Sequence, residues 1–246
     1  MPDNESYRLL DTDLLIEQVA SLRVRIDERF PTRRLACLCA ELELMARETR
    51  RRVLTIRQPM LGLRVTVGLA MILLVVAGWA TVRSLGIQAD HQLTAAALVG
   101  IVDGLTSELL LAGAAMVFLV RTERRVKQKR MLAALHELRS LAHVIDTHQL
   151  DKDPDRIFGA SRPTEHSPKP DLTAAETVRY LNYCSMMLSL IGHLAAVYVQ
   201  SFNDDVTAVA VNEVENLCQG LSRKVWQKIM IIHQDPRYRA SLPSLA

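Results

Sequence analysis

The sequence predicts an all-α membrane protein, with a two-helix transmembrane hairpin joined to a cytosolic helical bundle. Two apolar runs, near 63–82 and 101–120, lie in the middle of the chain. Apolar residues recur at helical spacing before and after these runs. The 246-residue chain is 49% apolar but only 4% aromatic, which favours helices over a β-sandwich.

Residues 1–60 are predicted to form two cytosolic helices. The first covers about Thr12 to Glu28. The second opens with "RFPTRRLACLCAELELMARE", where Pro31 suits a first turn, and Pro59 is expected to end it before the membrane. The polar, acidic start "MPDNESYRLLDTD" has no basic or short apolar region, so no cleavable signal peptide is predicted.

Residues 61–121 are predicted to form the hairpin. In "LRVTVGLAMILLVVAGWATV" nothing charged follows Arg64, and about 20 residues cover the roughly 30 Å hydrocarbon layer. The second run, "GIVDGLTSELLLAGAAMVFLV", is similar in length but holds Asp103 and Glu108. Basic residues are concentrated before the first apolar run and after the second, whereas the connecting "RSLGIQADHQ" has one arginine. Because basic residues stay on the cytoplasmic side, both termini are expected in the cytosol.

The two acids differ in their expected depth. Glu108 lies twelve residues before Val120, about 18 Å along the helix and within the hydrocarbon region. An unpaired carboxylate there costs at least a few kcal/mol, so Glu108 is expected to be protonated, paired or wetted. Asp103 is expected near the outer interface. Both are therefore candidate intramembrane functional residues.

Small residues surround the deeper acid on one face of the second run: Gly100, Gly104, Glu108 and Ala112. Gly100 and Gly104 form the GxxxG pattern that lets transmembrane helices approach closely. Antiparallel pairing places Val75 and Val76 opposite Glu108, and neither offers a hydrogen bond. This face is therefore predicted to pack on another helix, with Ser107 or a second protomer as the partner of the acid.

After the hairpin, a juxtamembrane helix is predicted over 122–150, and the Pro-rich, charged segment 151–171 is predicted to be a flexible linker. A helical pair over 172–233 and a tail over 234–246 complete the chain. Thr173 and Glu176 form a capping-box signature. Asp204 or Asp205 is the expected N-cap of the last helix.

The first helix of this pair carries apolar residues at heptad spacing: Leu181, Cys184, Leu188, Ile191, Ala195, Tyr198 and Phe202. A third membrane span near 188–199 is the alternative interpretation. Polar interruptions at Ser189, His193 and Gln200, together with the heptad, favour a soluble core helix.

The segment "HELRSLAHVIDTHQLDKD" is the most enzyme-like part of the sequence. His136 and His143 share a helix face and Asp146 lies nearby, a combination that binds metals or exchanges protons. The spacing is not that of HExxH, and the hydrophilic side of a juxtamembrane helix is the more ordinary interpretation. No metal and no other cofactor is predicted. The four cysteines lack CxxC spacing and fit reduced thiols.

The basic clusters also have two interpretations. They act as orientation signals by default, and they can bind anionic lipid headgroups at about 1 kcal/mol for each basic residue near the surface. The residues considered for headgroup binding are Arg51, Arg52, Arg121, Arg124 and Arg125. The net charge is only +3, so a nucleic-acid partner is not expected.

Four segments, "RFPTRRLACLCAELELMARE", "ALHELRSLAHVIDTHQLDKDP", "RYLNYCSMMLSLIGHLAAVYVQ" and "GLSRKVWQKIMI", resemble parts of uncharacterised bacterial two-pass inner-membrane proteins. The resemblance covers most of the chain. It implies the bacterial inner membrane as the location, and it carries no activity, cofactor or catalytic residue.

Three functions fit the sequence. The favoured one is a non-enzymatic, oligomeric membrane scaffold or adaptor that presents its cytosolic bundle to a protein partner. The second is an oligomeric channel or proton-coupled pore that uses Glu108 and Asp103, which requires several protomers because two spans cannot enclose a pore. The third is a membrane-anchored enzyme or metal site that uses His136 and His143.

Overall fold

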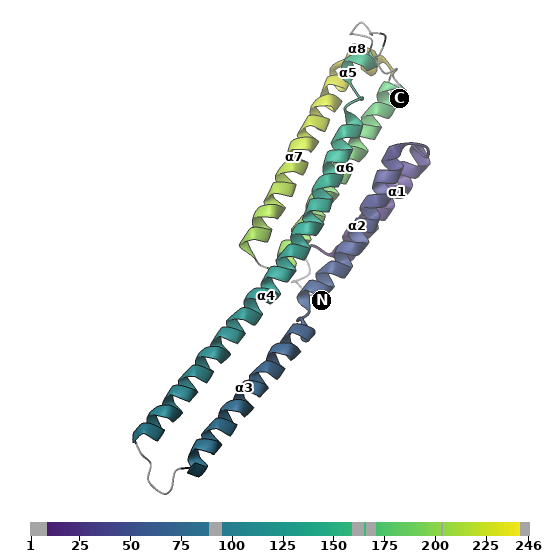
Figure 1. Cartoon of the computed structure of the whole chain (residues 1–246). Helices are drawn as coiled ribbons and strands as arrows, with labels where there is room; N and C mark the ends of the chain where they lie inside the picture. The colour runs from purple at the N-terminus through teal and green to yellow at the C-terminus, as the bar shows by residue number, and fades with distance from the viewer. Residues whose placement is uncertain (1–8, 89–94, 159–164, 166–170, 203, 242–246) are drawn as a thin grey trace, which may run out of the picture. The chain divides into compact units, whose positions relative to one another are not determined.

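The computed structural model describes residues 9–88, 95–158, 165, 171–202 and 204–241 (Figure 1). These residues form helices and turns, and none of them is in a strand. The elements in chain order are α1 (Thr12–Arg29), α2 (Arg34–Arg57), α3 (Leu61–Gln88), α4 (Ala95–Gln149), α5 (Pro154–Ile157), α6 (Ala174–Ser201), α7 (Asp205–Gln234) and α8 (Pro236–Ser241). The predicted all-helical fold is confirmed for this part of the chain.

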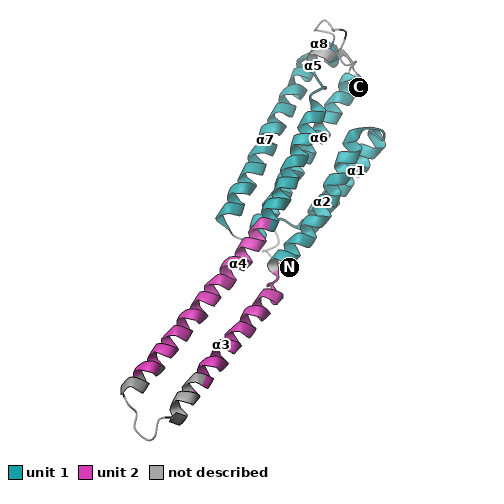
Figure 2. Cartoon of the chain, in the orientation of Figure 1, with its two compact units in different colours: residues 1–57, 130–246 teal, residues 58–129 magenta. Residues whose placement is uncertain are grey.

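The chain divides into two compact units (Figure 2). Unit 1 comprises residues 1–57 and 130–246, and unit 2 comprises Gln58–Lys129. Helix α4 is 55 residues long, and its first part belongs to unit 2 while its last part belongs to unit 1. The second apolar run and the predicted juxtamembrane helix are therefore parts of one continuous helix.

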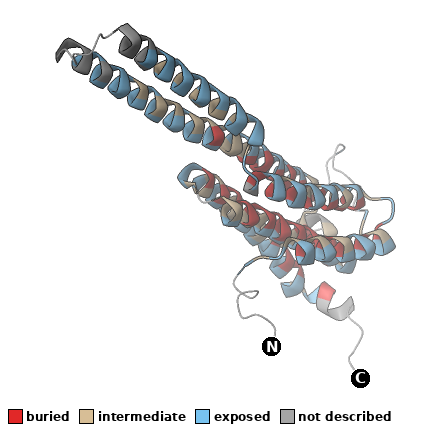
Figure 3. Cartoon of the chain, turned by 90° about the horizontal axis from the view of Figure 1, so that it is seen from below, coloured by how far each residue is buried: buried red, intermediate tan, exposed pale blue. Residues whose placement is uncertain are grey.

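Unit 1 is a helical bundle built around one hydrophobic core, to which α1, α2, residues 130–149 of α4, α6 and α7 all contribute. Buried residues gather there, as Figure 3 shows. The apolar stripe of each helix follows from residues repeating at intervals of three and four. In α1 this stripe is Leu15, Val19, Leu22 and Ile26. Removing such stripes from water is the main favourable contribution to folding.

Helix α2 begins later than the sequence suggested. Pro31 lies in the turn between Phe30 and Arg34 and not in the first turn of the helix, so that expectation was wrong. The other end agrees with the sequence, because α2 ends at Arg57 and Pro59 precedes α3. A proline has no N–H to donate and restricts the residue before it, which ends the helix.

Helix α6 is the central element of the bundle and packs on α1, α2 and α7. Its N-terminus has the predicted capping box: Thr173 Oγ1 accepts from the Glu176 N–H at 3.2 Å, and Glu176 Oε2 accepts from the Thr173 N–H at 2.8 Å. Six of the heptad residues are buried, from Leu181 to Tyr198, and Phe202 at the C-cap is half-buried. The capping box thus fixes where the helix begins, and the buried heptad residues fix which of its faces points into the core.

Helix α7 starts at the predicted cap. The side chain of Asp204 accepts a hydrogen bond from the Thr207 N–H at 3.1 Å. The seam that packs on α6 is Val211, Val214, Cys218, Leu221, Val225, Ile229 and Ile232.

The predicted linker over 151–171 contains structure at both of its ends. Helix α5 lies within it and packs on α7. At the other end, Asp171 is paired with Arg33 and also with Lys152, whose Nζ lies 2.9 Å from Oδ1. Residues 159–164 and 166–170 lie outside the described part of the chain.

Unit 2 contains α3 and the first part of α4. Half-buried residues form one seam on each helix: Leu63, Val67, Met71, Leu74 and Gly78 on α3, and Glu108, Ala112, Ala115 and Leu119 on α4. The remaining faces expose large apolar side chains, such as Leu73 at 70% and Leu109 at 75%. Such faces need an apolar surrounding.

Three helical stretches are long and apolar enough to cross a membrane. One ends at Ala80 and includes most of α3, the second starts at Val102 in α4, and the third is α6. The apolar windows of the first two have no buried residues, whereas half of the α6 window is buried inside the bundle. The composition of the chain is therefore consistent with membrane association.

Candidate functional site

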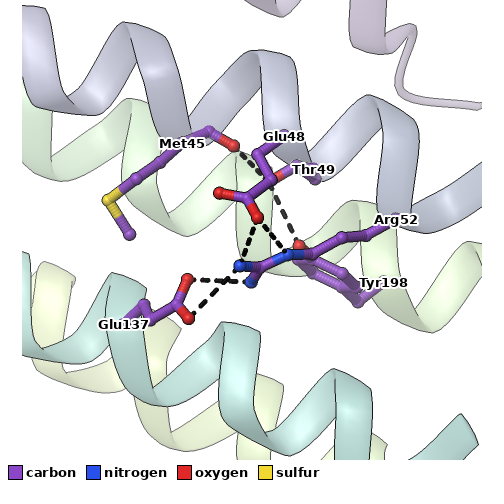
Figure 4. Close-up of polar contacts among 6 residues, drawn as sticks. All are labelled: Met45, Glu48, Thr49, Arg52, Glu137 and Tyr198. Carbon is purple, nitrogen blue, oxygen red and sulfur yellow. Dashed lines mark hydrogen bonds and ion pairs between the residues drawn. The ribbon is translucent and has the colours of Figure 1, made fainter.

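The conspicuous polar feature of unit 1 is Arg52 on α2, which holds two carboxylates from different helices (Figure 4). Its Nε and Nη2 donate to Glu48 Oε1 at 3.1 and 2.7 Å, one turn earlier on α2. Its Nη1 and Nη2 donate to the two oxygens of Glu137 on α4, at 2.8 and 3.2 Å. This forked geometry is specific to a guanidinium and fixes the rotation of α2 against α4.

The electrostatics of Arg52 follow from these contacts. Partial burial disfavours its charged form, but the hydrogen bonds to Glu137 and Glu48 outweigh burial and raise its pKa. Arg52 therefore stays charged, and its N–H groups are bonded to the carboxylates of Glu48 and Glu137. Although the sequence marked it as a headgroup-binding residue, the structure gives it a clamping contact between two helices.

Three residues earlier on the same face of α2, Thr49 connects the helix to α6 through a short chain of hydroxyl groups (Figure 4). The Tyr198 hydroxyl donates to Thr49 Oγ1 at 3.2 Å, and the Thr49 hydroxyl donates to the Met45 carbonyl at 2.8 Å. Burial raises the pKa of the Tyr198 phenol. One face of α2 is thus joined to α4 through Arg52 and to α6 through Thr49.

A groove of about 800 Å³ lies beside the Arg52 clamp, between α2 and the start of the unit-1 part of α4. Arg51 and Thr55 stand on its α2 wall, and Arg130 and Ala133 on its α4 wall. The guanidinium groups of Arg51 and Arg130 are exposed and have no hydrogen bond or ion pair to any described residue. The groove therefore presents two uncommitted positive charges, one on each wall.

The other basic residues considered for headgroup binding lie on the unit-2 part of α4. Arg121, Arg124 and Arg125 are all exposed. On the same stretch, Glu123 is 9% exposed and lies 2.9 Å from Lys127 Nζ. The hydrogen bond from Lys127 is the main cause that lowers the pKa of Glu123.

The intramembrane acid Glu108 has a partner position that the sequence analysis did not identify. Its carboxylate occupies the space beside Gly78 on α3 where any other residue would carry its Cβ. The expectation that Val75 and Val76 lie opposite was therefore wrong by two to three residues, which is less than one helical turn. The Glu108 carboxylate makes no hydrogen bond or ion pair to a described residue.

Gly100 and Gly104, on the same small-residue face, are not covered by any residue that the structure describes. A Cβ added to Gly100 or Gly104 would meet nothing within 4 Å. Ala112 is half-buried on the seam that Glu108 shares. Asp103 is exposed, and the structure pairs it with none of the described residues. Arg83 lies over the Trp79 ring, with its Cζ 5.0 Å from the ring centroid.

The histidine segment does not form a cluster. His136 and His143 are exposed, and Asp146 accepts a hydrogen bond from Gln149 Nε2 at 2.8 Å. Within the described ranges, no three His, Cys, Asp or Glu side chains are arranged to hold a metal ion.

Comparison of the chain with models of known protein families, with curated proteins and with solved structures gives no match. The resemblance to bacterial two-pass membrane proteins therefore stays a prediction. The site rests on the geometry of this chain alone.

The sequence analysis missed Glu48, Glu137, Thr49 and Tyr198 as a connected set. The i,i+4 spacing of Glu48 and Arg52 is a local signal of an ion pair on a helix. Glu137 follows Arg52 by 85 residues, and Tyr198 follows Thr49 by 149, so no local pattern links them.

Proposed function

We propose that this protein is an oligomeric membrane scaffold that presents a cytosolic helical bundle to a partner protein. In this proposal, α3 and residues 95–121 of α4 form a two-helix hairpin in the bacterial inner membrane, with both termini in the cytosol. The observation that carries it is the contrast in burial between the units. Unit 1 closes over its own core, whereas unit 2 exposes long apolar faces on both helices.

The proposal uses two spans because α6 already has a place for its apolar side chains. Its fully buried residues include Leu181, Met187, Leu188, Ile191 and Leu194. They belong to the same core as residues of α1, α2 and α7. Moving α6 into a membrane would expose the stripes of those helices to water, at roughly 25 cal/mol for each Å² of apolar surface.

Self-association is supported by the open small-residue face of α4. Among the described residues, Gly100 and Gly104 have no neighbour within 4 Å at the Cβ position, which leaves room for a second helix to approach the backbone there. The basic residues on both sides of the hairpin support the proposed orientation.

A proton- or cation-conducting oligomer is the second candidate. The observation that favours it is the Glu108 carboxylate, which lies in an apolar helix without a hydrogen bond or ion pair to a described residue. In an oligomer, Glu108 and Asp103 would line the path of the ion.

Two measurements test the topology. The protein is expected to stay in the membrane fraction after alkaline carbonate extraction. A cysteine introduced near Gln88, in a variant without its native cysteines, is expected to react with an impermeant thiol reagent in intact cells, whereas one at the C-terminus is not. Labelling at the C-terminus would overturn the orientation, and release by carbonate would overturn the hairpin.

The oligomer and the pore are separated by two substitutions. If copies pack through the glycine face, Gly104→Leu lowers the oligomer fraction in nanodiscs, and Glu108→Gln largely preserves it because an amide also donates a hydrogen bond, worth about 0.6–2 kcal/mol. Wild-type liposomes are expected to show no proton or potassium flux. A flux that Glu108→Gln abolishes, with the oligomer intact, would replace the scaffold by the pore.

A further inference from the structure

One side of the central helix α6 is left uncovered within unit 1. Helices α1 and α7 each pack along α6. Six α6 residues at alternating intervals of three and four are exposed or half-buried: Arg179, Asn182, Met186, Ser189, His193 and Ala196. This spacing keeps them on one side of the helix. The outward side of α6 is therefore the floor of a groove, and α1 and α7 form its walls.

Three cavities follow one another along this floor. The first, of about 680 Å³, is lined by the start of α6 and by Trp226 of α7. The other two, of about 470 and 590 Å³, share Ser189 and His193, and α7 lines the former while α1 lines the latter. The lining residues Arg179 and Ala196 are 17 positions apart, or about 26 Å along the helix. The floor is therefore as long as a helix of about eighteen residues.

The floor is shallow and its walls are apolar. Small residues line the floor at Ser189, Gly192 and Ala196, and a Cβ added to Gly192 would meet nothing within 4 Å. Large apolar side chains stand on the walls, where Leu14 of α1 is 53% exposed and Trp226 of α7 is 59% exposed. A groove of this form accepts the apolar face of an amphipathic helix. An exposed tryptophan is also typical of the residues that carry binding energy in an interface.

The charges of the groove are separated along its length. At the Trp226 end, Arg29 and Arg179 are exposed, and neither has a hydrogen bond or ion pair to a described residue. Farther along, Glu17 on α1 and Glu215 on α7 are likewise unpaired with any described residue. Arg29 and Glu17 are twelve positions apart on α1, or about 18 Å. The groove thus has a basic end and an acidic end.

This separation indicates the chemistry of the occupant. Glu176 also lines the basic end, but its carboxylate is bonded to Thr173, and the two arginines leave that end with a net positive charge. A membrane surface or a nucleic acid carries charge of one sign and would be repelled at the acidic end. A helix with acidic side chains at one end and basic side chains about three turns away complements both ends.

We propose that this groove binds one amphipathic helix of a partner protein. The acidic side chains of that helix lie near Arg29 and Arg179, and its basic side chains lie near Glu17 and Glu215. Its apolar face covers the floor at Gly192. The inference rests on the proposed scaffold function, because it names the surface of the bundle that the scaffold presents to its partner.

A designed peptide and the full-length protein in nanodiscs test the groove. The peptide has about eighteen residues without tryptophan, an alanine–leucine face, two glutamates near one end and two lysines about twelve residues away. In the Trp79→Phe variant, Trp226 is the remaining tryptophan of the chain. Its emission is expected to shift to shorter wavelength when the helix covers it. The fluorescence anisotropy of a labelled peptide gives the Kd.

Two glycines provide a matched pair of variants. Gly192→Leu fills the floor, whereas Gly220→Leu adds the same side chain to an exposed position of α7 that does not line the groove. Among the described residues, a Cβ at either glycine meets nothing within 4 Å, so neither variant is expected to lower the melting temperature. Gly192→Leu is expected to weaken peptide binding at least about ten-fold, and Gly220→Leu less than about two-fold. Equal losses would overturn the groove.

Charge reversal tests the two ends without altering the floor. Arg29→Glu with Arg179→Glu is expected to weaken the binding of this peptide about ten-fold and to strengthen that of a peptide with lysines at both ends. Arg34→Glu with Arg223→Glu alters exposed arginines of unit 1 outside the groove and is expected to have less than about a two-fold effect. Equal losses in the two variants would mean diffuse attraction and overturn the assigned polarity.

The remaining outcomes separate the groove from the scaffold. If the wild-type protein resists carbonate extraction but the peptide leaves Trp226 emission unchanged, the groove is overturned and the membrane scaffold stands. If the peptide binds but carbonate releases the protein, the groove stands and the hairpin is overturned. A dimer that Gly192→Leu converts to monomers would make a second copy the occupant and overturn the partner helix.

Discussion

Leu188 in α6 and Leu110 in α4 are the same residue type on two long apolar helices, yet Leu188 is fully buried and Leu110 is 69% exposed. Helix α6 lies in unit 1, where α1, α2 and α7 cover its apolar surface. The unit-2 part of α4 has one half-buried seam and exposed apolar faces elsewhere. Apolar side chains therefore pack into a protein core in α6, whereas in the unit-2 part of α4 they remain exposed and need an apolar surrounding.

The charged residues of the two units also differ in what surrounds them. In unit 1, arginines connect helices, as Arg52 does with Glu137 and Arg23 with Glu43. In the apolar part of unit 2, the acid Glu108 lies beside a glycine on the neighbouring helix. Ion pairs thus set the rotation of the bundle helices, whereas the absence of a side chain makes room for the acid in unit 2.

The largest difference is expected from shortening the two leucines. Leu188→Ala creates a cavity in the core and should lower the free energy of unfolding of unit 1 by about 2–5 kcal/mol. Leu110→Ala removes an exposed side chain and should leave it unchanged. Thermal unfolding of the full-length protein in detergent, followed by circular dichroism, measures both. Equal effects would mean that Leu110 is also part of a protein core.

A charge placed on the exposed apolar face tests the same contrast from the membrane side. Leu73→Arg on α3 should disfavour insertion by about 2.5–3.5 kcal/mol. Leu54→Arg on α2, at a position that is 54% exposed on the bundle, should have no effect. The fraction of protein that resists carbonate extraction reports the difference. Full insertion of Leu73→Arg would show that this face of α3 does not contact lipid.

The contact between α2 and α6 should contribute less than a core leucine. Tyr198→Phe removes the hydroxyl that donates to Thr49 and should cost about 1 kcal/mol, because the Thr49 hydroxyl keeps its bond to the Met45 carbonyl. Urea unfolding monitored by circular dichroism provides the value. Tyr180→Phe, on the same helix but without this bond, is the matched control. An equal loss in both would remove any special role for Thr49.

The smallest effect is expected at Glu43, and it should depend on pH. A hydrogen bond from Arg47 and, against the opposing effect of burial, one from Arg23 hold the pKa of Glu43 below its ordinary value of 4.5. Its ion pairs therefore stabilise unit 1 above that value, and the stabilisation is lost as pH falls through the lowered pKa. Glu43→Gln should cost about 0.5–1 kcal/mol at pH 7 and nothing in strong acid. A pH-independent deficit in unfolding experiments would assign the effect to packing.

The sequence by itself determined the features that depend on neighbours three or four residues apart. The capping box at Thr173, the N-cap at Asp204 and the apolar seams of α1, α6 and α7 all follow from helical spacing and local hydrogen bonds. The apolar length of the two central runs likewise predicted helices able to cross a membrane.

The tertiary structure decided which side chains meet across helices. Glu108 faces Gly78 and not Val75 or Val76, because the packing of both seams sets the register of α3 against α4. Arg52 joins Glu137 because a helix rotates by about 100° for each residue, so that a small change in packing brings a different side chain to the contact. Local spacing determines which face of a helix is apolar, whereas packing determines which side chains of the neighbouring helix that face contacts.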